Sequence, residues 1–269
     1  MALLPIPEPY DFALSTERFR AFGPDLANVW HENGLHRVVA GEEVRIAPAP
    51  GGVDVEPLDE TTDPVVRVLL GLPFDLDAFR AFAATDDVLA PLEGRLRGFR
   101  PPLQPDPWEA LVTSITAQQV SLHAAFAIRS RLIERFGERV GEVWAFPTRE
   151  RLAAATEEEV VAVGFSRRKA EYLATLARGD LDLDTLASLP DEQVQAAITA
   201  QRGLGEWTAD WFLARHLGRP RAWPAGDLGL RKAVEQFLGP TGDVRAAGER
   251  FDPFQNLAAH YLLVGLRVP

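Results

Sequence analysis

The sequence predicts an α+β fold, in which a small N-terminal domain with an antiparallel β-sheet and helices precedes a mostly α-helical domain. Two observations support this prediction. Short β-rich runs alternate with turn residues between residues 34 and 58. After about residue 75 the strand pattern ends, and apolar residues recur at helical spacing almost to the C-terminus. Pro-rich linkers near residue 100 mark the predicted boundary, which gives domains of residues 1–99 and 100–269.

The N-terminal domain is predicted to combine short strands with two helices. The strands are expected at residues 38–40, 44–47 and 53–56. Short turns rich in Gly and Pro separate them, so we expect them to pair as an antiparallel sheet. Helical spacing predicts one helix over residues 16–30, interrupted at Gly23 and Pro24, and a second over residues 64–70.

The rest of the chain is predicted to be helical. Segments with helical spacing are residues 76–84, 108–136, 149–163, 168–177, 190–200, 207–217, 228–238 and 254–266. The polar run at residues 118–121 interrupts the longest of these segments. Ser121 could cap a new helix at this point.

Composition excludes several kinds of site. The 269-residue chain has no cysteine, which excludes disulfides, cysteine-held zinc and a thiolate-bound iron–sulfur cluster. No apolar run approaches the roughly 18 residues that a membrane span needs, and the Pro-rich start lacks the basic residues of a signal peptide. We therefore expect a cytoplasmic protein. The histidines show no metal-ligand spacing with one another.

Net charge is a weak guide to the partners of this chain. The formal charge of −11 argues at first against nucleic acid. Residues 195–232 nevertheless carry six basic residues against three acidic ones, and residues 167–169 form a second basic cluster. Because local fields attract a phosphate backbone, a nucleic acid partner stays open. Lys169 and Lys232 are the only lysines, which limits amine nucleophiles to two side chains.

The segment GLGEWTA at residues 203–209 predicts a hairpin between two helices. Gly203 and Gly205 permit positive φ and a close approach to another backbone, while Leu204 would be buried to hold the hairpin in place. The free N–H groups at the start of the second helix would then face outward as an anion site, with the hydroxyl of Thr208 beside them. An ordinary helix–helix turn with glycine at a C-cap explains the same pattern equally well.

Asp227 is the second candidate feature. An aspartate directly before the helical segment at residues 228–238 is a good N-cap, and capping is the stronger interpretation of Asp227 alone. The two roles are compatible, because a capping carboxylate is held rigidly at a helix start. A carboxylate in that position suits electrostatic catalysis.

Two further patterns each have a structural and a functional interpretation. The polar run at residues 118–121 is either a plain kink or a short loop whose side chain enters a DNA duplex. Trp207 and Trp211, with Phe212 and Trp223 nearby, could stack on a base. Such aromatic residues more often belong to a core, and we expect this for Phe212.

Four motifs in this order and spacing resemble the helix–hairpin–helix DNA glycosylases, and within them the bacterial 3-methyladenine DNA glycosylase II (AlkA-type) family. They are QQVS at residues 118–121, GFSRRKA at residues 164–170, the hairpin at residues 203–209, and Asp227. The resemblance covers nearly the whole chain, including PYDF at residues 9–12. It implies an enzyme that removes alkylated purines, such as 3-methyladenine, from double-stranded DNA by base flipping in base excision repair. Because one subunit contains every proposed part, we expect a monomer.

The resemblance also assigns roles to individual residues. It implies that Asp227 is the catalytic carboxylate, that the hairpin binds the DNA backbone, and that Trp207 and Trp211 line the base pocket. Gln119 would fill the gap left by the extruded base. No cofactor is implied beyond a possible structural monovalent cation, Na⁺ or K⁺. The residues whose backbone carbonyls would hold it are Thr199, Gln201 and Leu204.

This chain departs from the family pattern at three points. Gln201 and Arg202 precede Gly203, where relatives have an apolar residue and proline; Gln119 is polar where some relatives place an apolar wedge; and Leu263 replaces a pocket tryptophan, which suggests a more open pocket. Relatives that also cut the strand carry lysine where this chain has Trp207, which cannot form a Schiff base. The resemblance therefore implies a monofunctional glycosylase. The alternatives are a non-catalytic damage-binding protein of the same fold, and a glycosylase/lyase that uses Lys169 or Lys232.

Overall fold

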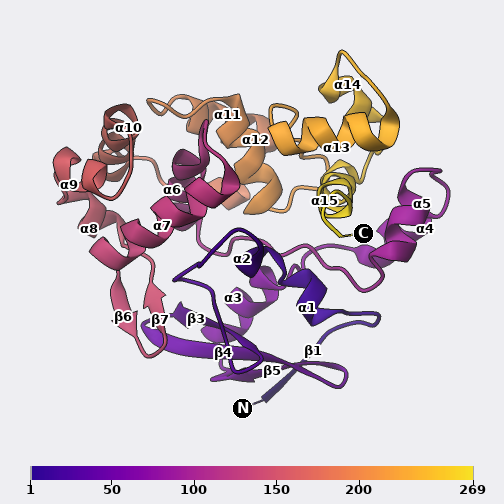
Figure 1. The fold of residues 1–269 in the computed structure, drawn as a ribbon, viewed down its shortest axis with the longest axis horizontal. Helices are drawn as coiled ribbons and strands as arrows, with labels where there is room; N and C mark the ends of the chain where they lie inside the picture. The colour runs from indigo at the N-terminus through magenta and orange to yellow at the C-terminus, as the bar shows by residue number, and fades with distance from the viewer. Residues whose placement is uncertain (1, 269) are drawn as a thin grey trace.

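The computed structural model describes residues 2–268 and contains a sheet at one end and a helical body above it (Figure 1). The strands of the sheet are β1 (Ala2–Pro5), β2 (Val29–His31), β3 (Gly34–Val39), β4 (Glu42–Ala49) and β5 (Gly52–Glu56). All neighbours are antiparallel, in the order β1-β5-β4-β3-β2. The α+β fold class and the antiparallel N-terminal sheet are thus confirmed.

The helices before the polar run at residues 118–121 are α1 (Phe12–Ser15), α2 (Arg18–Ala21), α3 (Thr62–Leu69), α4 (Leu76–Ala83), α5 (Leu89–Arg95) and α6 (Pro107–Ala117). Those after it are α7 (Leu122–Phe136), α8 (Arg149–Ala153), α9 (Glu157–Ala162), α10 (Arg167–Arg178), α11 (Asp191–Thr199), α12 (Glu206–Arg215), α13 (Leu228–Leu238), α14 (Val244–Glu249) and α15 (Gln255–Gly265). A 3₁₀ turn spans Leu186–Ser188. Among residues 2–268, no helix has the length and apolar character needed to cross a bilayer.

Three element predictions were wrong. The segment at residues 149–163 forms two helices, α8 and α9, because Thr156 caps a new helix start. Residues 16–30 do not form one helix, because the chain turns at Gly23, whose φ is 116°, and Val29–His31 joins the sheet as β2. The strand pattern also does not end near residue 75. Two short strands, β6 (Glu138–Val140) and β7 (Val143–Ala145), form a hairpin around Gly141. Strands of three residues are too short to show a period of two in the sequence.

Three hydrophobic cores organise the molecule. One lies between the sheet and α3, and includes Leu35, Ile46 and Leu69. A second joins α6–α12. The third packs α4 and α5 against α13–α15, so residues 74–103 share a core with residues 223–264. The predicted division between residues 99 and 100 stays a prediction, since the cores group the chain differently.

A buried ionic network fixes the sheet to the helical body. Glu109 on α6 is fully buried and accepts hydrogen bonds from Arg37 on β3 and Arg129 on α7. Arg129 also binds Asp25, which follows α2. Such a network is costly to break, because removing one partner leaves another buried charge without compensation. The N-terminal part is thus held against α6 and α7 in one arrangement.

Candidate active site

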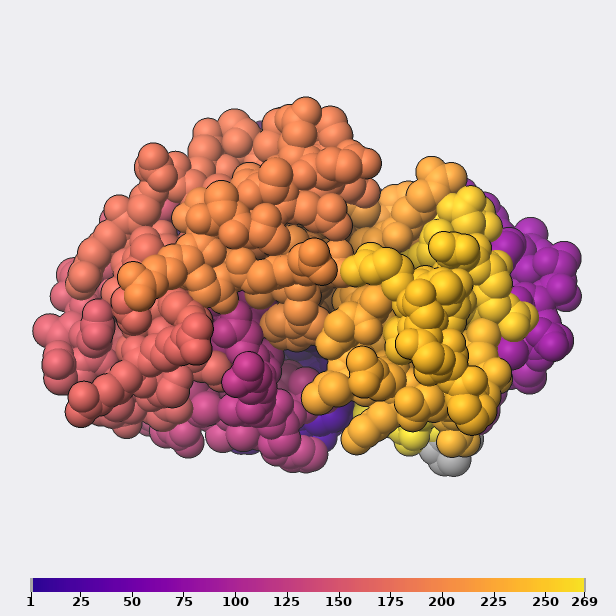
Figure 2. All heavy atoms as spheres, turned by 90° about the horizontal axis from the view of Figure 1, so that it is seen from above, coloured from indigo at the N-terminus to yellow at the C-terminus, as the bar shows by residue number. Residues whose placement is uncertain are grey.

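A cavity of about 1070 Å³ lies where the second and third cores meet. Viewed from above, the surface is hollowed between the helices of residues 100–220 and the C-terminal helices (Figure 2). Helices of the second and third cores line the cavity, together with the short helices α1 and α2 of the N-terminal part. The sequence-predicted residues that line it are Gln118, Gln119, Ser121, Gly203, Gly205, Trp207, Thr208, Trp211, Asp227 and Leu263.

The predicted hairpin joins α11 to α12. Gly203 has φ 84°, and a Cβ there would lie 2.2 Å from the ring of Tyr172, so both the turn and the close approach require glycine. Leu204 is 4% exposed and packs into the second core, as predicted. Gln118 fixes the hairpin from the other side, donating from Nε2 to the Gly203 carbonyl over 3.0 Å.

The start of α12 is free to bind an anion. Gly205 is its N-cap residue and supplies no side-chain acceptor, and both Gly205 and Glu206 are exposed. The first N–H groups of an α-helix have no partner within the helix and carry partial positive charge. Thr208 is buried, so its hydroxyl does not join these N–H groups on the outer surface as the sequence suggested. It lies in the wall of the cavity instead.

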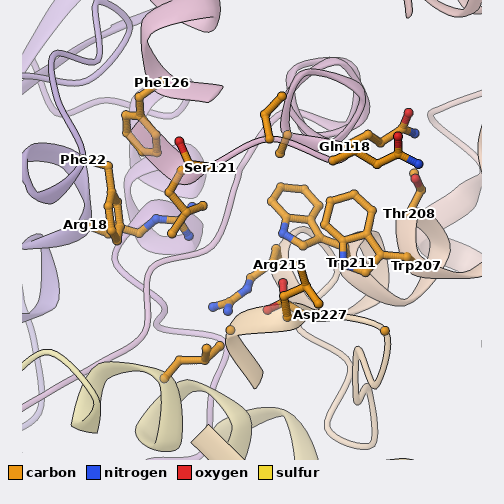
Figure 3. Close-up of a pocket in the computed structure, with 18 of the residues that line it drawn as sticks. Arg18, Phe22, Gln118, Ser121, Phe126, Trp207, Thr208, Trp211, Arg215 and Asp227 are labelled. Atoms are coloured by element: carbon orange, nitrogen blue, oxygen red, sulfur yellow. The ribbon is translucent and has the colours of Figure 1, made fainter. Parts of the chain in front are cut away.

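Asp227 is both a helix cap and a wall of the cavity. Its Oδ1 accepts a hydrogen bond from the Leu230 N–H over 3.0 Å, which confirms the predicted N-cap of α13. The carboxylate projects toward the same space as the indole rings of Trp207 and Trp211 (Figure 3). A Cβ at Gly229 would lie 3.0 Å from Oδ1, so glycine there leaves the carboxylate uncrowded.

The aromatic residues divide into wall and core. Trp207 and Trp211 lie on the same face of α12, are half-buried and line the cavity. Phe212 is fully buried, as expected. Trp223 is also a core residue: it packs on Phe251, and its Nε1 donates to the Val244 carbonyl over 2.8 Å. Of these four aromatic residues, only Trp207 and Trp211 line the cavity.

Residues 118–121 form a loop between two helices. Gln118 ends α6, and the Ser121 hydroxyl accepts from the Ala124 N–H over 3.2 Å, which confirms the predicted cap of α7. Gln119 between them is exposed and has φ 55°, an unfavourable conformation for any residue other than glycine. Val120 and Leu122 beside it are exposed apolar residues. The loop thus holds the polar side chain of Gln119 at the mouth of the cavity on a strained backbone.

Sequence reasoning missed the groups at the floor of the cavity. Arg18 from α2 and Arg215 from the end of α12 both reach it (Figure 3). Burial, followed by repulsion from Arg267, lowers the pKa of Arg18 to about 10. Burial, followed by repulsion from Arg18, lowers the pKa of Arg215 to about 9. No sequence motif marks either residue, because the fold brings them together from distant parts of the chain.

His260 lies beside these arginines. Its Nε2 is 3.0 Å from Arg215 Nη1. Burial and then the charge of Arg215 hold the pKa of His260 well below its usual 6.5, so the imidazole is neutral near pH 7. A neutral ring accepts a hydrogen bond from the guanidinium and orients it.

Comparison with known proteins identifies the fold around this site. Residues 112–251 match the model of the HhH-GPD superfamily base excision DNA repair proteins, a range that contains the α6–α7 loop, the hairpin and Asp227. The chain belongs to this superfamily. It is 31% identical to the putative DNA-3-methyladenine glycosylase YfjP of Bacillus subtilis, over 58% of this chain and 57% of that protein.

Two further relatives extend the similarity beyond the matched range. The probable bifunctional transcriptional activator/DNA repair enzyme AlkA of Mycobacterium tuberculosis is 32% identical over 84% of this chain and 48% of its own length. The solved structure of the 3-methyladenine DNA-glycosylase from Archaeoglobus fulgidus superposes with a TM-score of 0.88 at 25% identity, covering 98% of this chain and 97% of that one. The chain spans about half of the length of the curated relatives.

The two lysines of this HhH-GPD protein occupy different environments. Lys169 lines the cavity, but its Nζ donates to the Thr116 carbonyl at the end of α6 over 2.9 Å. Burial lowers the pKa of Lys169. Lys232 is exposed on α13 and does not line the cavity.

The resemblance expects a monovalent cation on the backbone carbonyls of Thr199, Gln201 and Leu204, at the end of α11 and in the hairpin. Thr199 ends α11, and the Gln201 carbonyl accepts the Leu204 N–H over 3.1 Å. Within residues 2–268 no cluster of three or more acidic or histidine side chains is arranged to hold a metal. A cation at the hairpin would therefore depend on backbone oxygens.

Proposed function

We propose that this chain is a monofunctional DNA glycosylase that removes alkylated purines from duplex DNA and leaves an abasic site. The observation that carries the proposal is the position of Asp227, a rigid helix-capping carboxylate that faces a cavity walled by Trp207 and Trp211. The relatives named as 3-methyladenine glycosylases support the choice of alkylated purines.

Binding would begin at the hairpin. The free N–H groups at the start of α12 suit a DNA phosphate, and contacts of this kind position a protein without reading sequence. Gln119, exposed at the mouth of the cavity, would enter the space that the extruded nucleotide leaves. Extrusion costs roughly a few kcal/mol and costs least for a damaged base that pairs and stacks poorly.

The chemistry would take place between the tryptophans and Asp227. A purine alkylated at a ring nitrogen carries positive charge, which an indole face favours by about 0.5–2 kcal/mol. Departure of the base develops oxocarbenium character on the sugar. The Asp227 carboxylate would stabilise that charge and orient water toward the anomeric carbon. The bond from the anomeric carbon to nitrogen breaks with its electron pair leaving on the cationic base, which departs neutral. Water forms the new bond to the anomeric carbon, and the proton that it loses would pass to the Asp227 carboxylate and from there to solvent.

The residue at position 207 favours a monofunctional enzyme that hydrolyses the glycosidic bond without cutting the strand. Trp207 has no amine, and Lys169 already donates to a helix carbonyl. We expect no covalent adduct when the enzyme is treated with borohydride during turnover. An adduct that disappears in Lys169→Gln or Lys232→Gln would instead identify a glycosylase/lyase.

The substitution Asp227→Asn tests the proposal, because asparagine is also a good N-cap and keeps the helix start intact. We expect base release from alkylated duplex DNA to fall by at least about a hundredfold. DNA affinity and melting temperature should stay close to those of the wild type. Asp227→Ala is the matched control for the cap, since it removes both the charge and the hydrogen bond to Leu230.

Two results would contradict this assignment. Base release unaffected by Asp227→Asn would leave Asp227 as a structural cap. Lesion binding by the wild type without any base release would favour the second candidate, a non-catalytic damage-binding protein.

Two further properties belong to the proposal. A monovalent cation on the backbone carbonyls of Thr199, Gln201 and Leu204 would add positive charge where a phosphate binds, so DNA affinity should change when K⁺ is replaced by Li⁺ at constant ionic strength. The enzyme would act as a monomer on double-stranded DNA, since one chain contains every residue named above.

A further inference from the structure

Two guanidinium groups enter the cavity without an acidic partner. Within residues 2–268, Arg18 makes no hydrogen bond or ion pair, and Arg215 contacts only neutral His260. The neighbouring Arg267 differs, because it pairs with Glu17 over 3.0 Å. The donors of both groups face the cavity, so a ligand that displaces water from them must supply acceptors in its place. Arg18 and Arg215 therefore favour a ligand with acceptor atoms at this point of the cavity.

The two groups converge on one place. Figure 3 shows Arg18 and Arg215 projecting from opposite sides into the space between Phe22 and the tryptophan wall. Their mutual repulsion contributes to the lowered pKa of Arg215, and both keep their charge at neutral pH because each pKa stays at about 9 or above. Asp227 offsets part of the charge of Arg215, and Asp25 and Glu17 offset part of that of Arg18.

The position of Arg18 is fixed by the backbone around it. The Ser15 hydroxyl accepts from the Arg100 N–H over 3.0 Å, and the Asp11 N–H donates to the Gly98 carbonyl over 2.8 Å. These bonds join α1, which directly precedes α2, to the segment that leads into α6. The backbone that carries Arg18 therefore follows an anchored helix at the floor of the cavity.

A purine held against the tryptophans would present one edge to this floor. The edge of a 6-oxopurine carries the acceptor O6, whereas a 6-aminopurine carries an amino donor at the same place. Guanidinium groups only donate, so they complement O6 and leave the amino group unpaired.

We propose that Arg18 and Arg215 determine specificity by donating hydrogen bonds to O6 of an extruded 6-oxopurine, so that the enzyme favours alkylated guanine over alkylated adenine. This inference rests on the proposed glycosylase function. It concerns the same cavity but assigns a role to an N-terminal residue, Arg18, outside the matched range of the superfamily.

The test compares the release of 7-methylguanine with that of 3-methyladenine. Both bases are cationic in DNA, so repulsion by the arginines affects them alike. They differ at position 6, in the methylated ring nitrogen and in the 2-amino group, so 3-methylguanine from the same preparation is measured as well, because it shares the methyl position of 3-methyladenine. All three bases are released from one preparation of methylated duplex. Single-turnover rate constants for each are measured with wild type, Arg18→Met and Arg18→Lys.

We expect Arg18→Met to lower the ratio of 7-methylguanine to 3-methyladenine release by about 5- to 100-fold. Arg18→Lys keeps the charge but loses the forked donor, so its ratio should lie between those of the wild type and Arg18→Met. Arg20→Met is the matched control: Arg20 lies on the same short helix, binds the Ala13 carbonyl and does not line the cavity. Its ratio should equal that of the wild type.

Two outcomes would overturn the inference: an unchanged ratio in Arg18→Met, whether or not both rate constants fall, or the same change of ratio in Arg20→Met. An equal loss for both bases, together with weaker binding to undamaged duplex, would make Arg18 a phosphate contact.

A second measurement does not need catalysis. Quenching of the tryptophan fluorescence of the protein, to which Trp207 and Trp211 in the cavity wall contribute, by the free bases should show a preference for 7-methylguanine that Arg18→Met removes. Absence of base release by the wild type would reject the proposed function, while this binding preference, present or absent, still decides the inference.

Discussion

The two glycines of the hairpin provide a direct test, because alanine should have different effects at each. At Gly203, alanine must adopt φ 84°, which costs about 1–2 kcal/mol. Its Cβ would also lie 2.2 Å from the Tyr172 ring, and relieving such overpacking costs about 1–3 kcal/mol. Together these give a loss of about 3 kcal/mol in the free energy of unfolding. At roughly 2–4 °C per kcal/mol, the melting temperature should fall by roughly 6–12 °C.

Gly205→Ala is the matched comparison. The residue has φ −111°, which any residue adopts, and a Cβ there meets no atom within 4 Å. We expect a stability loss below about 1 kcal/mol, the cost of a poorer N-cap. The methyl group would nevertheless stand where a phosphate approaches the start of α12, so affinity for damaged and undamaged duplex should fall alike.

The assay combines thermal unfolding with DNA binding at fixed salt. Equal melting temperatures for Gly203→Ala and Gly205→Ala would refute the strain argument. Unchanged DNA affinity in Gly205→Ala would remove the hairpin from the DNA interface and leave it as a helix–helix turn.

Three other substitutions follow from the same structure. Gln119→Gly relieves the positive φ of 55°, so stability should rise by about 0.5–1 kcal/mol while base release falls, as measured by urea unfolding and a single-turnover assay. Because folded His260 stays neutral and its pKa rises toward 6.5 on unfolding, stability should fall as pH drops below 6.5, by up to about 1.4 kcal/mol per pH unit. His260→Gln should flatten that dependence between pH 5 and 7; an unchanged slope would assign it to other groups. Ser121→Ala should cost about 1 kcal/mol by removing the cap of α7, and an unchanged melting temperature would contradict this.

Local signals predicted local structure well. The helix expected at residues 228–238 is α13 to the residue, because Asp227 caps its start and Gly239 follows its end. Ser121 likewise marked the break between α6 and α7. The helix expected at residues 16–30 failed, since the apolar residues Leu26 and Trp30 serve a turn and a strand. Helical spacing over a short window cannot distinguish these uses when tertiary packing decides.

The candidate site was predictable where its parts are close in sequence. Trp207, Trp211 and Asp227 all follow the hairpin within residues 207–227, so a motif could place them together. Arg18 and His260 come from opposite ends of the chain and meet only through packing. One arginine among many carries no signal of its own, and only the folded chain shows that it lacks an acidic partner.

The contribution of the N-terminal part explains why the buried ionic network matters for the cavity. Arg129 binds Asp25, a few residues after α2, and Glu109 on α6. The same two helices, α6 and α7, flank the loop that carries Gln119. The network therefore fixes the floor that holds Arg18 relative to the loop at the mouth of the cavity. A substitution in the sheet that disturbs this network would then alter both the selectivity for the base and its extrusion from the duplex, because the network fixes Arg18 and the Gln119 loop relative to each other.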